Sequence, residues 1–199
     1  MSKATSAILL ESIAAPILIT LLLLPFQALT PMVAYTPFVI LPIVLFFALR
    51  MPVGGLVAMF LSFTVGVVWF WLFTLVAGLL PNVPQPALLS VGVTVVIFLV
   101  LFVHRVFLAN TPFAVVPAAL LGVVQGLVVM LVMPMIGEDA PRLTLLWLVG
   151  IFAYGCVLTA VTVFTTDALN NAIFGKGWRG EDASPDVDKD DSEVTPQQS

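Results

Sequence analysis

The amino-acid sequence predicts an all-α polytopic transmembrane helix bundle with about six spans. Hydrophobic residues make up 61% of the 199 residues and charged residues only 9%, whereas a soluble domain carries about 25% charged residues. The charges leave four uncharged stretches, residues 12–49, 51–103, 106–137 and 143–166, and a helix needs about 20 apolar residues to cross a bilayer. These observations exclude an ordinary water-soluble fold.

The first three expected spans are residues 7–24, 32–49 and 54–79. Pro25 closes the first, and Arg50 with Pro52 closes the second. The third ends at the proline-rich loop 81–86, since proline cannot continue a helix. Lys3 and the apolar run after it also resemble a signal peptide. Five further apolar stretches and no persuasive cleavage site favour a retained first span.

The other three expected spans are residues 87–103, 111–136 and 143–165. The fourth stops at His104 and Arg105, and a charged loop, 137–142, follows the fifth. The sixth leaves the membrane near Thr165. Residues 1–175 are therefore expected to form one transmembrane domain.

The distribution of charge predicts the orientation of the chain. Residues 1–175 hold four basic and four acidic side chains, so the net charge of −4 belongs to residues 176–199. That segment is expected to be a disordered, acidic, cytoplasmic tail. With both termini in the cytoplasm, the five basic residues nearest the inner span ends lie inside and only Arg142 lies outside, as the positive-inside rule requires. These five are Lys3, Arg50, Arg105, Lys176 and Arg179. We expect a multi-pass protein of the cell inner (cytoplasmic) membrane whose partner is the lipid bilayer.

A short internal repeat suggests two related halves. The segment Thr36-Pro37-Phe38-Val39-Ile40-Leu41-Pro42 matches Thr111-Pro112-Phe113-Ala114-Val115-Val116-Pro117 at four of seven positions, 75 residues and three spans later. A duplication over an odd number of spans has inverted topology, which often builds a solute site near the midplane. Chance similarity between two apolar segments is the alternative. The predicted solute-binding residues are Thr36, Pro37, Thr111, Pro112 and Gln125.

Small residues recur every four positions along two spans: Gly54, Ala58, Ser62 and Gly66 on the third, and Ala118, Gly122 and Gly126 on the fifth. Such stripes let helix backbones approach closely in lipid. The sequence leaves open whether they meet each other, other helices or a second copy in a homo-oligomer.

Five polar residues are expected at the cytoplasmic edge: Glu11, Arg50, His104, Arg105 and Asp167. They form either an inner gate or a proton-linked cluster, with His104 titrating near neutral pH, or they are anchors that reach to water. Gln125 is the only amide deep in a span, where it binds a solute or a neighbouring helix.

Enzyme signatures are absent, and we expect no catalytic activity. No zinc-protease, serine-hydrolase or phosphate-binding motif occurs in the sequence. One cysteine, Cys156, and one histidine, His104, exclude a disulfide framework and multi-histidine metal sites. We expect no metal, no cofactor and no nucleic-acid partner.

Four glycine-rich or apolar segments, Gly54-Gly55-Leu56, Gly66-Val67-Val68-Trp69, residues 113–122 with Pro117, and residues 148–155, resemble the bacterial inner-membrane proteins classed as domain of unknown function 1097. The resemblance covers about residues 30–160. It implies a compact multi-span bundle without an assigned activity and gives no catalytic residue.

Two functions follow as hypotheses. The first is a small-solute transporter or channel-like protein with its path between the two repeats. The second is a non-transporting membrane scaffold or accessory subunit. A path predicts that Thr36, Thr111 and Gln125 converge on one cavity, whereas a scaffold predicts that they point into separate helix contacts.

Overall fold

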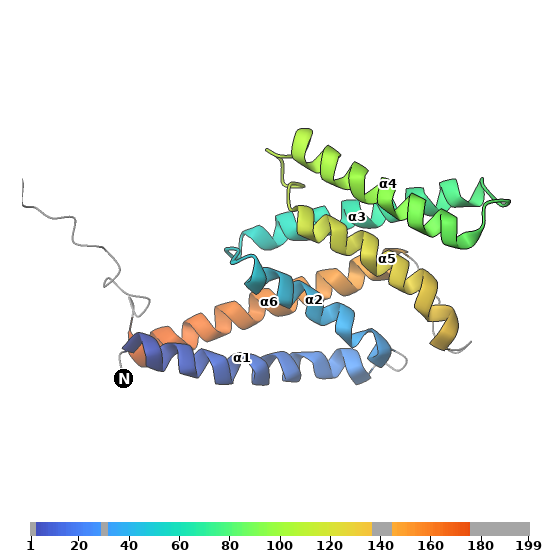
Figure 1. Cartoon of the computed structure of the whole chain (residues 1–199). Coiled ribbons are helices and arrows are strands. Elements are labelled where there is room, and N and C mark those ends of the chain that lie inside the picture. The colour runs from blue at the N-terminus through green and yellow to red at the C-terminus, as the bar shows by residue number, and fades with distance from the viewer. Residues whose placement is uncertain (1–2, 29–31, 137–144, 176–199) are drawn as a thin grey trace, which may run out of the picture.

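The computed structural model describes residues 3–28, 32–136 and 145–175, and these residues form helices joined by turns (Figure 1). The elements are α1 (Lys3–Ala28), the short 3-10 helix η1 (Met32–Tyr35), α2 (Thr36–Ala48), α3 (Gly55–Gly78), α4 (Gln85–Val106), α5 (Val116–Ile136) and α6 (Leu145–Phe174). The predicted all-α bundle is confirmed. The predicted acidic tail and the 137–142 loop lie outside the described residues.

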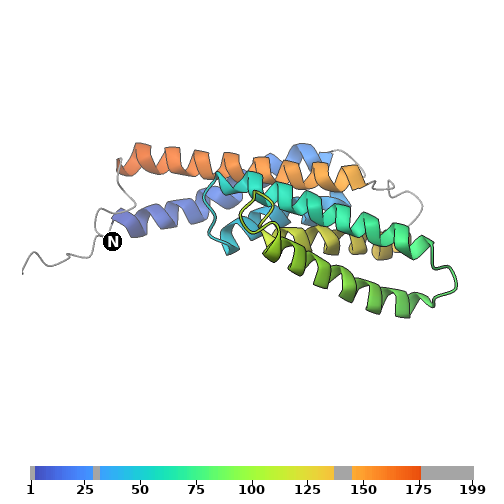
Figure 2. The same ribbon diagram turned by 90° about the horizontal axis from the view of Figure 1, so that it is seen from above.

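Successive helices run in opposite directions along the bundle (Figures 1 and 2). The start of α1, the connections 49–54 and 107–115, and the end of α6 lie toward one end, which we call the terminal end. The start of α2 and the connection 79–84 lie toward the other, the distal end. Helices α1, α3, α4 and α6 are long and apolar enough to cross a membrane. Helix α2, with 13 residues, is shorter. The chain is therefore a multi-pass membrane protein.

Several helix boundaries differ from those expected from the sequence, and α2 begins at Thr36 because residues 32–35 form the 3-10 helix η1. Helix α1 continues through Pro25 to Ala28, because a proline removes one backbone hydrogen bond and membrane helices tolerate this loss. Helix α5 begins at Val116 instead of Thr111. Helix α6 extends beyond Thr165 to Phe174 and ends before Gly175, whose φ of 84° is the left-handed conformation typical of a helix end.

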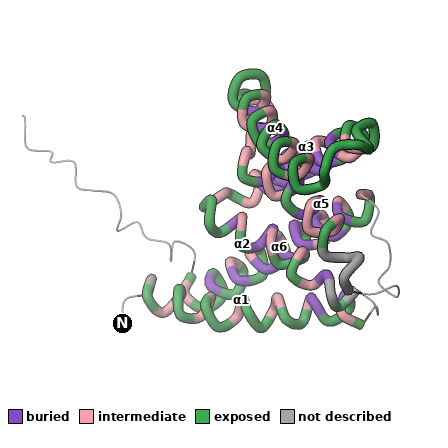
Figure 3. The backbone as a smooth tube through the Cα atoms, turned by 45° about the vertical axis from the view of Figure 1, so that its right-hand side comes forward, coloured by how far each residue is buried: buried purple, intermediate pink, exposed green. Residues whose placement is uncertain are grey.

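The largest interfaces join α3 to α5 and α2 to α6. Helix α1 lies along α6, and α4 lies against α3 and α5. Buried residues concentrate on α3, α5 and α6, whereas α1 and α4 are mostly exposed (Figure 3). In a bilayer these exposed apolar faces contact lipid. The core is therefore formed by α2, α3, α5 and α6, with α1 and α4 at the periphery.

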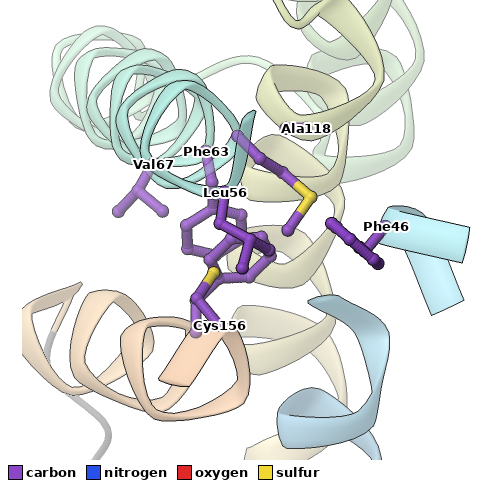
Figure 4. Close-up of a cluster of buried hydrophobic side chains, with 8 residues drawn as sticks. Phe46, Leu56, Phe63, Val67, Ala118 and Cys156 are labelled. Atoms are coloured by element: carbon purple, nitrogen blue, oxygen red, sulfur yellow. The ribbon is translucent and has the colours of Figure 1, made fainter. Parts of the chain in front are cut away.

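The central core cluster joins these four helices (Figure 4). Its buried members are Phe46, Leu56, Met59, Phe63, Val67, Ala118, Phe152 and Cys156. The rings of Phe63 on α3 and Phe152 on α6 stack with centroids 3.7 Å apart and an interplanar angle of 5°. This contact lies between the N-terminal and C-terminal halves of the chain.

Glycines allow the closest approaches between these helices. A Cβ on Gly66 would overlap the carbonyl oxygen of Ala119, and one on Gly122 would overlap the carbonyl oxygen of Phe63. The two small-residue stripes thus meet each other within one chain. On α6, a Cβ on Gly155 would overlap the carbonyl oxygen of Val39. The close packing of α2 with α6 uses the same device, although the sequence stripes did not include Gly155.

Candidate functional site

A cavity of about 410 Å³ opens toward the terminal end, and we call it the vestibule. Its walls are Glu11, Phe46, Phe47, Arg50, Met51, Pro52, Val53, Val163 and Asp167. Three separate elements supply its charged side chains: α1 carries Glu11, the turn after α2 carries Arg50, and α6 carries Asp167. The fold therefore brings together three members of the predicted cytoplasmic-edge cluster.

The turn that ends α2 positions Arg50. The amide of Arg50 donates to the Phe47 carbonyl at 3.1 Å, and the amide of Met51 donates to the Phe46 carbonyl at 3.2 Å. This pair of hydrogen bonds is the Schellman arrangement, which usually has glycine at the position of positive φ. Here Arg50 occupies that position, with φ 49°. An arginine in this conformation is less stable than a glycine by about 1–2 kcal/mol.

The vestibule combines opposite charges with an apolar wall. Glu11 and Asp167 are partly buried, and Arg50 is exposed. Phe47 and Met51 are among the apolar residues beside them. The cavity thus offers hydrogen-bond acceptors from two carboxylates and donors from one guanidinium, next to a hydrophobic surface.

His104 and Arg105 do not line the vestibule, which corrects the expected five-residue cluster. Both lie in the last turn of α4. His104 is buried, and its Nδ1–H donates to the Val100 carbonyl at 2.9 Å, while Nε2 has no partner within the described part of the chain. Arg105 is exposed. The sequence placed all five residues at one edge because their spans end there, but α4 packs against α3 and α5, away from α1.

The two Thr-Pro motifs lie at opposite ends of the bundle. Thr36 and Pro37 begin α2 toward the distal end, whereas Thr111 and Pro112 precede α5 in the connection at the terminal end. The Thr111 hydroxyl donates to the Leu108 carbonyl at 2.8 Å within that connection. The expected convergence of Thr36 and Thr111 on one cavity is therefore not found.

Gln125 lies on α5 and is only 2% exposed. Neither its Oε1 nor its Nε2 has a hydrogen-bond partner among the described residues, so the expected bond to a neighbouring helix is not found there. Gln125 follows Ala118 of the central core cluster by two helical turns and shares its face. A buried amide without partners destabilises a protein by about 1–3 kcal/mol.

Helix α6 carries a buried polar stripe that was not predicted from the sequence. It consists of Thr159, Thr162, Thr166 and Asn170, each at most 2% exposed. Thr159 and Thr166 donate to carbonyls of the preceding turn, at 2.7 and 2.9 Å. Thr162 Oγ1 and both amide atoms of Asn170 have no partner in the described residues. The sequence shows these polar residues at helical intervals of three and four. The expected span ended near Thr165, however, so Thr166 and Asn170 were not recognised as part of the same helix.

A second cavity is a groove of about 580 Å³ between α3 and α4, which we call the α3–α4 groove. Its walls are almost wholly apolar, and they include Trp69, Phe73, Val76, Val91 and Gly92. A smaller groove of about 280 Å³ between α1 and α6 includes Ile17 and Leu169. Among the described residues, no group of three or more His, Cys, Asp or Glu side chains is arranged to hold a metal ion.

Comparisons with known proteins give no match. No protein-family model matches the sequence, and neither the curated proteins nor the solved structures contain a significant match. The resemblance to domain of unknown function 1097 therefore stays a prediction.

Proposed function

We propose that the protein transports a small solute, that its six helices form two inverted repeats, α1–α3 and α4–α6, and that the vestibule is its opening at the terminal end. The observation that carries this proposal is the paired packing of the helices. Under this correspondence α1 matches α4, α2 matches α5, and α3 matches α6. Exchanging the halves converts the α3–α5 interface into the α6–α2 interface, and these two interfaces are the largest in the chain.

The contacts at single residues support the same correspondence. Phe63 and Gly66 on α3 match Phe152 and Gly155 on α6, 89 residues later. Gly66 packs against the carbonyl of Ala119, and Gly155 packs against the carbonyl of Val39. Phe63 stacks on its own counterpart, Phe152. A residue that contacts its own counterpart lies beside the two-fold axis, so the axis passes near this stack.

The register of α2 and α5 differs from the one that the sequence repeat indicates. Matching Val39 with Ala119 requires a shift of 80 residues, whereas the Thr-Pro-Phe segments are 75 residues apart. The same shift of 80 matches Pro37 with Pro117, each the second residue of its helix. The proposed repeat therefore rests on equivalent helix contacts. The identical residues of the two Thr-Pro-Phe segments do not occupy equivalent positions in α2 and α5.

The two lipid-facing grooves are also related by the repeat. The α1–α6 groove includes Thr165, Thr166 and Leu169. Subtracting 89 gives Val76, Ala77 and Leu80, all of which line the α3–α4 groove. This agreement supports the correspondence independently of the glycine contacts.

Transport is the function that these features support best. Inverted repeats in membrane proteins commonly place a solute site at the interface between the halves, near the midplane. Gln125 and Thr162 have buried polar atoms without partners in the described residues. Such groups are stabilised when a solute or water enters the membrane interior. The vestibule provides access from the terminal end.

Reconstitution tests the proposal. Purified protein in liposomes should carry at least one member of a panel of ions, amino acids, sugars and amines faster than empty liposomes do. The Gln125→Met variant should reduce that flux, while Gln85→Met, at an exposed amide at the start of α4, should leave it unchanged. An absence of flux for the whole panel in both orientations would overturn the proposal.

The α3–α4 groove favours a second candidate, an accessory subunit that docks another membrane helix. A groove with almost wholly apolar walls is typical of a surface that another helix or lipid covers. Affinity capture from native membranes should then recover one defined partner, and Gly92→Phe should abolish this recovery. Capture of the protein alone would contradict this candidate.

A further inference from the structure

We infer that the vestibule binds a small zwitterionic solute with an apolar body, a molecule of the α-amino acid type. This inference rests on the proposed transport function for its physiological role, but the binding itself requires no transport. It starts from three charged side chains on three different elements that line a single cavity.

The charges suit a ligand that carries both signs. The Arg50 guanidinium presents donors in a planar fork that matches a carboxylate. The carboxylates of Glu11 and Asp167 accept hydrogen bonds from an ammonium group. A purely anionic ligand would face two carboxylates, and a purely cationic ligand would face the guanidinium. A zwitterion can satisfy both kinds of group in one pose.

The walls and the size suit the rest of such a molecule. Phe46, Phe47, Met51 and Val163 give the cavity an apolar side, against which an aliphatic or aromatic body can pack. The volume of about 410 Å³ lies within the range of small-molecule pockets. The vestibule therefore selects for a compact ligand with one charged end and one apolar end.

The membrane interior beyond the vestibule also favours a solute without net charge. Thr162 lies about one and a half turns before Asp167 on α6, on the side away from the terminal end, and its buried hydroxyl is neutral and has no partner in the described residues. A net charge is costly to move into a membrane. The cost is lower when the protein offers neutral hydrogen-bonding groups. It is also lower when the positive and negative charges of the ligand cancel.

Three probes with the same body test the inference: leucine, leucinamide and N-acetylleucine. They present a zwitterion, a cation and an anion at neutral pH. We expect isothermal titration calorimetry on the full chain in lipid nanodiscs to show leucine binding at least tenfold more tightly than either capped probe. Equal affinities for the three, or no binding of leucine, would overturn the inference.

Variants test which protein side chain contacts each charged group of the ligand. Arg50→Gln should weaken leucine binding at least tenfold but should not weaken leucinamide binding, because it removes a positive charge that faces the cation. Asp167→Asn should weaken leucine binding at least tenfold but should not weaken N-acetylleucine binding, because it removes a negative charge that faces the anion. Arg105→Gln is the matched control, because Arg105 is an exposed base at the same end that does not line the cavity.

Thermal unfolding of each variant confirms that it is folded. A loss with Arg105→Gln as large as that with Arg50→Gln would show a general effect of surface charge and overturn the inference. Flux of another solute without leucine binding would overturn this inference but leave the proposed transport function standing. Leucine binding without flux of any solute would support this inference but overturn the proposed transport function.

Discussion

Phe63 of α3 and Phe152 of α6 stack face to face at the centre of the bundle, with ring centroids 3.7 Å apart. Both side chains are fully buried. In lipid, helix association depends on close packing, because apolar side chains gain little by leaving a hydrocarbon solvent. This stack joins the two halves of the chain directly, and its loss should affect the whole bundle.

Phe63→Ala and Phe152→Ala should each lower the free energy of unfolding by about 3–5 kcal/mol, as truncation of a buried phenylalanine does. The double variant should show a coupling of about 0.5–1.5 kcal/mol from the lost ring contact. Unfolding by denaturant in mixed micelles measures these values. Phe164→Ala is the control, because Phe164 on α6 is 62% exposed. An equal loss in Phe164→Ala would contradict the central role of the stack.

Two glycines on α6 should respond oppositely to an added methyl group. Gly155→Ala should destabilise the protein by about 1–3 kcal/mol or more, because the new Cβ would overlap the carbonyl of Val39. Gly150→Ala should be neutral or stabilising by up to about 1 kcal/mol, since no atom lies within 4 Å and alanine favours a helix. Thermal unfolding of the two variants side by side measures the difference. Equal stability of the two would contradict the α2–α6 packing.

Arg50→Gly should raise the free energy of unfolding by about 1 kcal/mol, because glycine adopts the left-handed conformation of this residue without strain. The same change should weaken leucine binding at least tenfold, as Arg50→Gln does. Denaturant unfolding and calorimetry measure the two effects on one sample. A variant that loses stability would show that the Arg50 side chain makes contacts that outweigh its backbone strain.

Gln125→Met should raise the free energy of unfolding by about 1–3 kcal/mol, because it replaces a buried amide without described partners by an apolar side chain of similar shape. Transport of the solute should fall at the same time. A gain in stability together with a loss of flux is the signature of a residue kept for function. Destabilisation would instead indicate that the amide is bonded in the membrane.

The connections 79–84 and 107–115 should lie on opposite sides of the membrane. In a Cys156→Ala background, a membrane-impermeant maleimide should label Asn110→Cys only from the cytoplasmic side and Asn82→Cys only from the outer side. The positive-inside rule gives the direction, and the alternating helices require the two connections to differ. Labelling of both from one side would contradict the six-span topology.

Local properties of the chain made the helices predictable. Apolar stretches interrupted at Arg50, at the 81–86 prolines and at Arg105 located most helix ends within a few residues. The ends of α1 and α6 were missed because a membrane helix can continue through a proline or a polar residue. Pro25 and Asn170 both lie inside helices.

The candidate site was predictable only in part, because it depends on which helices are neighbours. The ends of the apolar stretches identified Glu11, Arg50 and Asp167 as polar residues at one edge, and the contact of α1 and α2 with α6 gathers them in one cavity. The same reasoning placed His104 with them. The sequence contained no signal that α4 packs on the opposite side of the bundle.

The sequence by itself determined membrane residence, the expected number of spans and the positions of the charges, because these follow from local apolar length and from the cost of burying charge. Only the tertiary structure decided that the two small-residue stripes meet each other and that Phe63 faces Phe152. Such pairings depend on the shape complementarity of distant helices. In a uniformly apolar sequence, the residues that face another helix and those that face lipid are chemically alike, so the sequence does not show which helices pair.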